Sequence, residues 1–167
     1  MKTNYLKLMK VAGTMSQANA NLVENRMKVL VIGSGGVGKT ALLNRIAGLP
    51  HDDRYIPTTE IQERTARNIL FYDLPGQYRY GRHQQIPGLT HCIRLYDTTE
   101  SESLFRGTTQ AWRDIATEIC GSPCSVKFLV AGNKIDMPSR FLAHGGHLVS
   151  AKTGQGVEDL VDELLSR

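Results

Sequence analysis

The eight residues GSGGVGKT, from Gly33 to Thr40, have types and a spacing suited to binding phosphate. They fit the pattern G-x-x-x-x-G-K-[ST], in which glycines let backbone N–H groups curl around phosphate oxygens. Lys39 would add a point charge, and the Thr40 hydroxyl is a magnesium ligand in such loops. The pattern therefore predicts a site for a nucleoside triphosphate and Mg²⁺, built from Gly33, Gly35, Gly36, Val37, Gly38, Lys39, Thr40 and Ala41.

A second polar motif, Asn133-Lys134-Ile135-Asp136, indicates which base the nucleotide carries. A carboxylate at Asp136 can accept the two N–H groups of guanine N1 and N2, whereas adenine would leave it unpaired. Further on, the backbone of Ser150-Ala151-Lys152 is placed to reach the guanine oxygen. The sequence therefore predicts a guanine site formed by Asn133, Lys134, Asp136, Ser150, Ala151 and Lys152.

These motifs follow apolar runs of strand length that alternate with helical patterns. The predicted strands cover 27–32, 68–72, 91–97, 126–132 and 147–150, and the predicted helices cover 41–48, 103–119 and 156–165. Such alternation predicts a three-layer α/β fold, with a mostly parallel sheet of about six strands and helices on both faces. An open sheet of this kind binds ligands at the carboxyl ends of its strands, where both motifs fall.

Length and composition limit the other possibilities. The 167 residues are enough for one domain, with 41% hydrophobic and 22% charged residues and no apolar run long enough to span a membrane. The net charge of +4 is spread along the chain, so no specific nucleic-acid partner is expected. Three cysteines without a secretory signal favour reduced thiols and a cytoplasmic location.

Residues 1–25 form an N-terminal extension that precedes the domain of residues 26–167. Its polar composition favours a flexible arm, although a short basic amphipathic helix that touches a membrane surface or a partner stays open. Neither a myristoylation signal nor a cysteine for prenylation is seen at the chain ends. Membrane contact is therefore expected to be peripheral at most, through a partner or through this basic segment.

From Met27 to its end the chain resembles the Ras-like small GTPases, on the Rab and Ran side, which have a P-loop NTPase G domain. The resemblance implies that Thr58, in YIPTTE, closes on Mg²⁺ and the γ-phosphate, with Thr59 as the alternative and Tyr55 also at the nucleotide. It also implies that Thr40, Thr58 and Asp73 form the metal set.

The string Asp73-Leu74-Pro75-Gly76-Gln77 matches the segment that senses the γ-phosphate in the same family. The resemblance implies that the Gly76 amide binds that phosphate and that Gln77 orients the attacking water. Lys39, Thr58 and Gln77 would then be the catalytic residues of slow hydrolysis of GTP to GDP.

The partners that the resemblance implies are guanine nucleotide and effector, exchange-factor and GTPase-activating proteins. One alternative is a nucleotide-gated interaction module with negligible hydrolysis. Another is a ribosome-associated GTPase, since similar DxPG strings occur in that group.

Several positions depart from the family pattern. His51 stands where a phenylalanine usually packs against guanine, so we expect faster nucleotide exchange, unless His51 simply points to solvent. Pro75 should stiffen the hinge before Gly76. The stretch from Tyr78 to His83 is basic and aromatic, which is typical of an interface as well as of a solvated loop.

Two connections are shorter than in the family. Only 16 residues separate Glu60 from Gln77, so the second and third strands must turn sharply, near Arg67-Asn68. Only 13 separate Asp136 from Ser150, which leaves room for little or no helix there.

Overall fold

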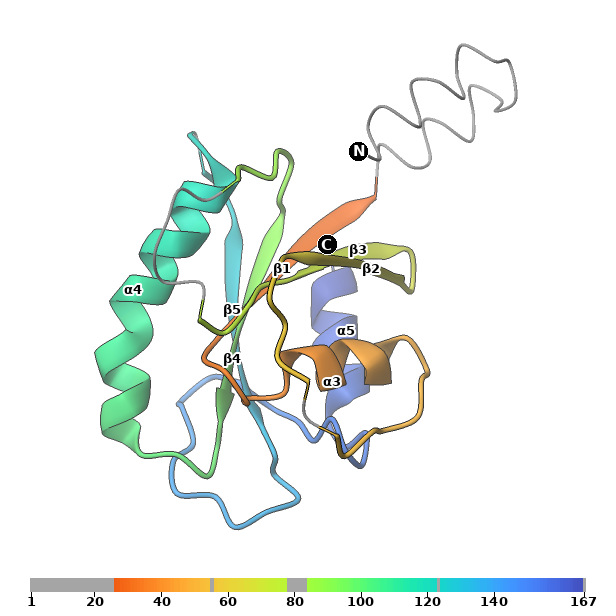
Figure 1. Ribbon diagram of the computed structural model, residues 1–167, viewed down its shortest axis with the longest axis vertical. Coiled ribbons are helices and arrows are strands. Elements are labelled where there is room, and N and C mark those ends of the chain that lie inside the picture. The colour runs from red at the N-terminus through yellow and green to blue at the C-terminus, as the bar shows by residue number, and fades with distance from the viewer. Residues whose placement is uncertain (1–25, 55, 78–83, 123, 167) are drawn as a thin grey trace.

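The structure is a computed structural model that describes residues 26–54, 56–77, 84–122 and 124–166. The N-terminal extension, Tyr55 and the basic aromatic stretch 78–83 lie outside these residues, so the predictions made for them stay predictions. Figure 1 shows a central twisted sheet with helices on both sides of it.

The sheet has six strands in the order β2-β3-β1-β4-β5-β6. Neighbouring strands are parallel except for the antiparallel pair β2 and β3. The mostly parallel sheet of about six strands is therefore confirmed. Its strands are β1 (Met27–Ile32), β2 (Gln62–Ala66), β3 (Ile69–Asp73), β4 (His91–Asp97), β5 (Lys127–Asn133) and β6 (His147–Leu148).

A two-residue turn at Arg67 and Asn68 joins β2 to β3, where the short spacing required a turn. Both residues have positive φ, 51° and 61°. Two consecutive left-handed residues form the hairpin turn whose twist matches that of the flanking strands, and asparagine tolerates this conformation. The shortened hairpin thus keeps strand pairing intact from Gln62↔Asp73 to Ala66↔Ile69.

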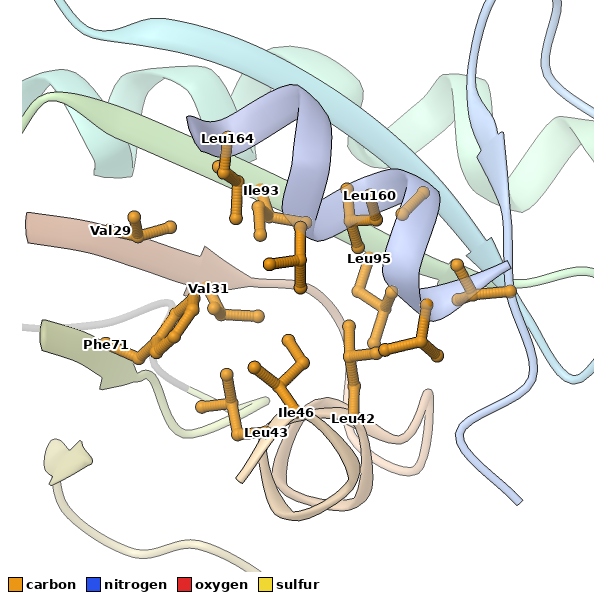
Figure 2. Packing of buried hydrophobic residues seen from close by; sticks show 14 of the residues in the cluster. Val29, Val31, Leu42, Leu43, Ile46, Phe71, Ile93, Leu95, Leu160 and Leu164 are labelled. Atoms are coloured by element: carbon orange, nitrogen blue, oxygen red, sulfur yellow. The ribbon is translucent and has the colours of Figure 1, made fainter. Parts of the chain in front are cut away.

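Three helices occur in the described residues: α3 (Lys39–Ile46), α4 (Glu102–Cys120) and α5 (Val157–Leu165). α3 and α5 cover one face of the sheet and α4 covers the other, which confirms the three layers (Figure 1). Val29 and Val31 of β1 belong to the same buried cluster as Leu42 and Leu43 of α3 (Figure 2). Their neighbours Leu30 and Ile32 belong to the cluster on the α4 side.

Because β1 is buried on both faces, it reads as a continuous apolar run rather than as an alternating one. Its carboxyl end is therefore held rigidly at the point where the glycine-rich loop begins. Burial in the middle of the sheet is what fixes that loop in space.

The connection between β5 and β6 contains no helix in the described chain, as its length predicted. The predicted strand 147–150 is confined to His147–Leu148, and Ser150 N donates to Gln155 O of the following loop rather than to β5. Val149 N still donates to Gly132 O at 2.8 Å, which ties this segment to the end of β5.

Candidate functional site

A cleft of about 800 Å³ lies at the carboxyl edge of the sheet. It is bounded by the glycine-rich loop, by residues 50–54 and 56–59, by residues 75–77 and by the loops after β5 and β6. The cleft therefore brings together segments that are far apart in the sequence. The predicted site residues that line it are Gly35, Gly36, Gly38, Lys39, Thr40, Ala41, His51, Thr58, Gly76, Gln77, Asn133, Lys134, Asp136, Ala151 and Lys152.

Gly33 and Gly38 are glycines because their backbones pass too close to neighbouring atoms. A Cβ on Gly33, at φ 147°, would lie 2.2 Å from the Leu95 carbonyl oxygen. A Cβ on Gly38, at φ 93°, would lie 2.3 Å from Asn133 Nδ2. The side chain of Val37, a predicted phosphate-binding residue, is buried in the core. Val37 could therefore contact a phosphate only through its backbone.

The Lys39 side chain folds back along the loop. Its Nζ donates to Gly33 O at 2.8 Å and to Ser34 O at 3.0 Å, and only 6% of the residue is exposed. Burial lowers the pKa of Lys39 to about 8, while the nearby Asp73 opposes that change. In the described residues the hydrogen bonds of this buried ammonium go to carbonyl oxygens, so an added anion would offset part of the cost of burying the charge.

Thr40, Thr58 and Asp73, the three predicted metal ligands, meet at one point. Thr40 Oγ1 donates to Asp73 Oδ2 at 2.5 Å and lies 3.1 Å from Thr58 Oγ1. Thr58 contacts Thr40, whereas Thr59 is exposed. The structure therefore favours Thr58 over Thr59 as the third ligand.

Asp73 is fully buried, and its Oδ1 has no hydrogen-bond partner among the described residues. Burial raises the pKa of Asp73, and the hydrogen bond from Thr40 partly offsets this effect. A buried carboxylate oxygen without a partner needs an explanation, and hydroxyl and carboxylate oxygens are the ligands that Mg²⁺ prefers. This oxygen set therefore fits a magnesium ion.

The segment after β3 packs directly against the glycine-rich loop. A Cβ on Gly76 would lie 2.3 Å from Gly35 N and 2.4 Å from Gly35 Cα, so position 76 needs glycine. Pro75 is buried just before this contact, and Gln77 is exposed at the cleft. The backbone of Gly76 thus sits beside the loop that is expected to hold the phosphates.

At the other end of the cleft, buried polar residues hold the predicted base-binding loops. Ser150, which is fully buried, donates from Oγ to Asp136 Oδ1 at 2.6 Å. Asn133 donates from Nδ2 to Val37 O and accepts from Ala151 N, both at 2.9 Å. Asn133 therefore links the glycine-rich loop to the Ser-Ala-Lys segment.

Two residues that the sequence reading missed also fix these loops. Asp97, at the end of β4, accepts from Lys134 Nζ at 2.5 Å, and Lys134 has a left-handed φ of 71°. Burial opposes ionisation of Asp97, but the bonds from Lys134 and Thr99 outweigh it and the pKa is lowered. From α3, Arg45 donates to the carbonyl oxygens of Ala151 and Lys152.

His51 lines the cleft rather than standing apart from it. Its Nε2 lies 3.2 Å from Asp53 Oδ1, and its side chain is 23% exposed. The same Asp53 oxygen accepts from Lys152 Nζ at 3.3 Å. Asp53, also missed by the sequence reading, therefore joins the loop after α3 to the Ser-Ala-Lys loop across the mouth of the cleft.

A glycine-rich loop between a buried strand and a helix, with a guanine-type motif along the same sheet edge, defines the class of P-loop nucleotide-binding domains. Residues 28–161 match the sequence model of the Ras family. The chain therefore belongs to the Ras family.

Individual relatives point the same way. Ras-related protein Rab-7B of Dictyostelium discoideum is 32% identical over 127 residues, which cover 68% of this chain and 60% of that protein. Ras-related protein Rab-18 of Caenorhabditis elegans is 27% identical over 163 residues, covering 84% of this chain and 79% of that protein. The Ypt/Rab-type GTPase YPT7 of Saccharomyces cerevisiae is 27% identical over 129 residues, again covering 60% of the relative.

Within the described residues, none of the helices has the length and apolar character needed to cross a bilayer.

Proposed function

We propose that the chain is a GTP-binding molecular switch that hydrolyses GTP to GDP and phosphate with Mg²⁺. The observation that carries this proposal is that Thr40 and Thr58, which line the cleft beside Lys39, meet each other and that Thr40 bonds to buried Asp73. Thr40 belongs to α3 and Asp73 to β3, whereas Thr58 belongs to the loop that precedes β2. The position of this loop could therefore depend on whether the γ-phosphate is present. Gly76 supplies a second such contact.

Thr40, Thr58 and Asp73 would hold the magnesium ion through oxygen atoms. When bound, the ion supplies charge that stabilises the phosphates as they separate. Lys39 would bind the β- and γ-phosphates, and the N–H groups from Gly35 to Ala41 would surround them at the start of α3. These residues do their work by position and charge rather than by covalent chemistry.

Guanine selectivity rests on Asp136, because its carboxylate is fixed by the hydrogen bond from buried Ser150. One carboxylate oxygen is thereby oriented, and the group stays an acceptor for the N1 and N2 protons of guanine. Lys134 is held by Asp97, Lys152 lies near Asp53, and the alkyl portions of the two lysines would flank the base.

Gln77 is the residue that would orient the attacking water, since it is exposed at the cleft and follows Gly76 directly. Single-turnover hydrolysis of GTP tests this role. We expect slow hydrolysis by the wild type, and in Gln77→Leu a rate lower by about tenfold to a hundredfold, because the water loses its orientation.

Equal, near-zero rates for both proteins, with GTP affinity intact, would instead favour a nucleotide-gated interaction module. Buried Pro75, which stiffens the approach to Gly76, is the feature that motivates this second candidate. Removing Mg²⁺ with a chelator supplies an independent readout, since it should speed GDP release if the three oxygen ligands act as proposed.

The partners that follow from this function are effector, exchange-factor and GTPase-activating proteins that read the segments around Thr58 and Gly76. The location proposed with this function is cytoplasmic, with membrane contact through a partner or through the basic N-terminal segment. The DLPG string also motivates a ribosome-associated role, and co-sedimentation with ribosomal particles tests it.

A further inference from the structure

A second cavity, of about 260 Å³, lies between α4, the β4–β5 part of the sheet and the loop of residues 138–146. None of its lining residues is shared with the nucleotide cleft. It exists because the connection from β5 to β6 is short and has no helix, so only a loop covers this part of the sheet on the α4 side.

Arg94, on β4, lines this cavity from a strand that is otherwise almost wholly buried. Only 6% of the residue is exposed, and its guanidinium lies 4.0 Å from the centre of the Phe105 ring. Within the described residues its guanidinium donates to Thr109 Oγ1 at 2.5 Å, to Phe105 O at 2.6 Å and to Thr108 Oγ1 at 3.1 Å. All of these partners are neutral, and they use three of the five N–H donors of arginine.

The charges around Arg94 add to its own rather than balance it. Arg106 and Arg113 line the same cavity, and the Glu102 carboxylate pairs with Arg106 at an exposed position. Burial, and secondly the charge of Arg113, lower the pKa of Arg94 to about 10, so the side chain is still a cation at neutral pH. A buried cation among neutral dipoles and other cations is costly, and a bound anion would offset that cost.

The rest of the cavity wall is aromatic and apolar. Phe105, Phe128 and Phe141 line it, which are three of the four phenylalanines of the chain. Phe105 and Phe141 pack together with ring centres 5.2 Å apart, and both contact Tyr96. Tyr96 also accepts from Ala143 N at 2.8 Å, so the loop wall of the cavity is fixed in place.

Apolar surface continues beyond the cavity. Phe128 is 37% exposed, with Arg113 lying 5.9 Å from its ring centre. Leu148 of β6 stands opposite Gly132 in the sheet, hence on the same face as Arg94, and is 38% exposed. A ligand that fills the cavity with an acidic group can therefore rest an apolar group on the adjoining strand surface.

We propose that this cavity, here called the arginine cavity, binds a short acidic segment of a partner protein, with a carboxylate on Arg94 and a neighbouring apolar side chain on Phe128. Arginine suits this task because its planar donors match a carboxylate in a two-bond contact. The volume fits one or two side chains rather than a large cofactor, which favours a peptide. The proposal does not rest on nucleotide binding, because the two sites share no lining residue.

The test uses the full chain with GDP and Mg²⁺ and a short synthetic peptide in which glutamate alternates with phenylalanine. A peptide with glutamine in place of glutamate, and inorganic phosphate, are the matched probes. NMR titration of isotope-labelled protein gives both the affinity and the location, since Ala143 and His144 lie on the loop wall. We expect the acidic peptide to bind, more weakly as salt is added, and the glutamine peptide to bind at least about tenfold more weakly.

Three variants separate the arginine cavity from general charge effects. Arg94→Leu should weaken binding of the acidic peptide by about tenfold or more, because the buried donor is gone. Arg113→Gln, which changes an exposed residue and leaves the fold intact, should weaken it by several-fold, as expected for a peripheral charge. Arg67→Gln removes an exposed arginine at the β2–β3 turn and should leave the affinity unchanged.

Equal binding of the glutamine peptide would overturn the proposal, since the site would then be merely apolar. Binding of phosphate alone, dependent on Arg94, would overturn the assignment to a peptide. Peptide binding that is insensitive to both Arg94→Leu and Arg113→Gln, or no binding by the folded wild type, would also overturn it. GDP affinity, measured in parallel, should be the same in all variants, so failure here is distinct from failure of the proposed switch.

Discussion

The two ends of the nucleotide cleft are built differently. At the phosphate end the groups that would touch the ligand are themselves buried, as with Lys39 and Asp73. At the base end Asp136 is exposed, and buried Ser150 and Asn133 hold its loop from behind. If the proposed function holds, the phosphate end would lower the cost of binding by pairing buried charges, while the base end would select the ligand by orientation.

Lys39→Met tests the phosphate end and should have the largest effect. We expect nucleotide affinity to fall by about a hundredfold or more, because charge-assisted bonds to phosphate contribute about 1.5–3 kcal/mol each. Without nucleotide, the free energy of unfolding should stay the same or rise, because an apolar side chain replaces a desolvated ammonium. Titration with a fluorescent nucleotide and urea unfolding measure the two quantities.

The control for this variant is Lys127→Met, which removes an exposed lysine paired with Glu163. It should leave nucleotide affinity unchanged. If Lys39→Met unfolded more easily than the wild type in the absence of nucleotide, Lys39 would be a structural residue and the contrast between the two ends would fail.

Asp136→Asn tests selection at the base end. GTP affinity should fall by about tenfold to a hundredfold, since a hydrogen bond to a charged group contributes about 1.5–3 kcal/mol. Affinity for xanthosine triphosphate should rise, because the asparagine amide can donate to the second carbonyl of xanthine. Competition binding measures the affinity for GTP and for xanthosine triphosphate. Asp162→Asn, which changes an exposed aspartate, serves as the control. A variant that lost both nucleotides equally would show that Asp136 supports the loop rather than reads the base.

His51→Phe should produce a smaller change, confined to the base end. A phenylalanine against guanine adds about 0.5–1.5 kcal/mol of aromatic contact, so GDP dissociation should slow by about twofold to tenfold. Stopped-flow release of a fluorescent GDP measures the rate. An unchanged rate would mean that His51, although it lines the cleft, does not contact the base.

Asp53→Asn should change the rate of GDP release least of all, and should raise it where His51→Phe lowers it. It removes the exposed contacts to His51 and Lys152, which are 3.2 and 3.3 Å long. Exposed pairs contribute about 0–1 kcal/mol, so GDP release should speed up by no more than about fivefold. Added salt should erase the difference between variant and wild type. An effect larger than that of Asp136→Asn would show that the mouth of the cleft, and not the base contact, controls release.

Much of the fold and the motif residues could be predicted because the signals are local. A buried strand, a glycine loop and a helix follow one another directly, and the two-residue turn at Arg67 and Asn68 follows from a short connection. The residues that were missed act over long sequence distances: Lys134 and Asp97 are 37 positions apart, and Lys152 and Asp53 are 99 apart. No local pattern marks such a pair, since an aspartate at a strand end or in a loop is ordinary in sequence.

Arg94 illustrates a different limit of sequence reading. Within HCIRLYD it reads as a polar interruption of a buried strand. The spacing does not reveal that, in the described part of the chain, its hydrogen-bond partners include no carboxylate. The cavity beside it depends on the missing helix between β5 and β6, which the spacing did predict. Only the structure shows that the two features coincide.

The bonds of Asn133 have a mechanical consequence. One amide group ties Val37 of the phosphate loop to Ala151 of the base loop, so neither loop can shift without straining the other. If the chain binds nucleotide as proposed, a partner that pulled on the Ser-Ala-Lys segment alone would also disturb the phosphate loop. Nucleotide release would then start from the rim of the cleft, without any contact at its polyphosphate end.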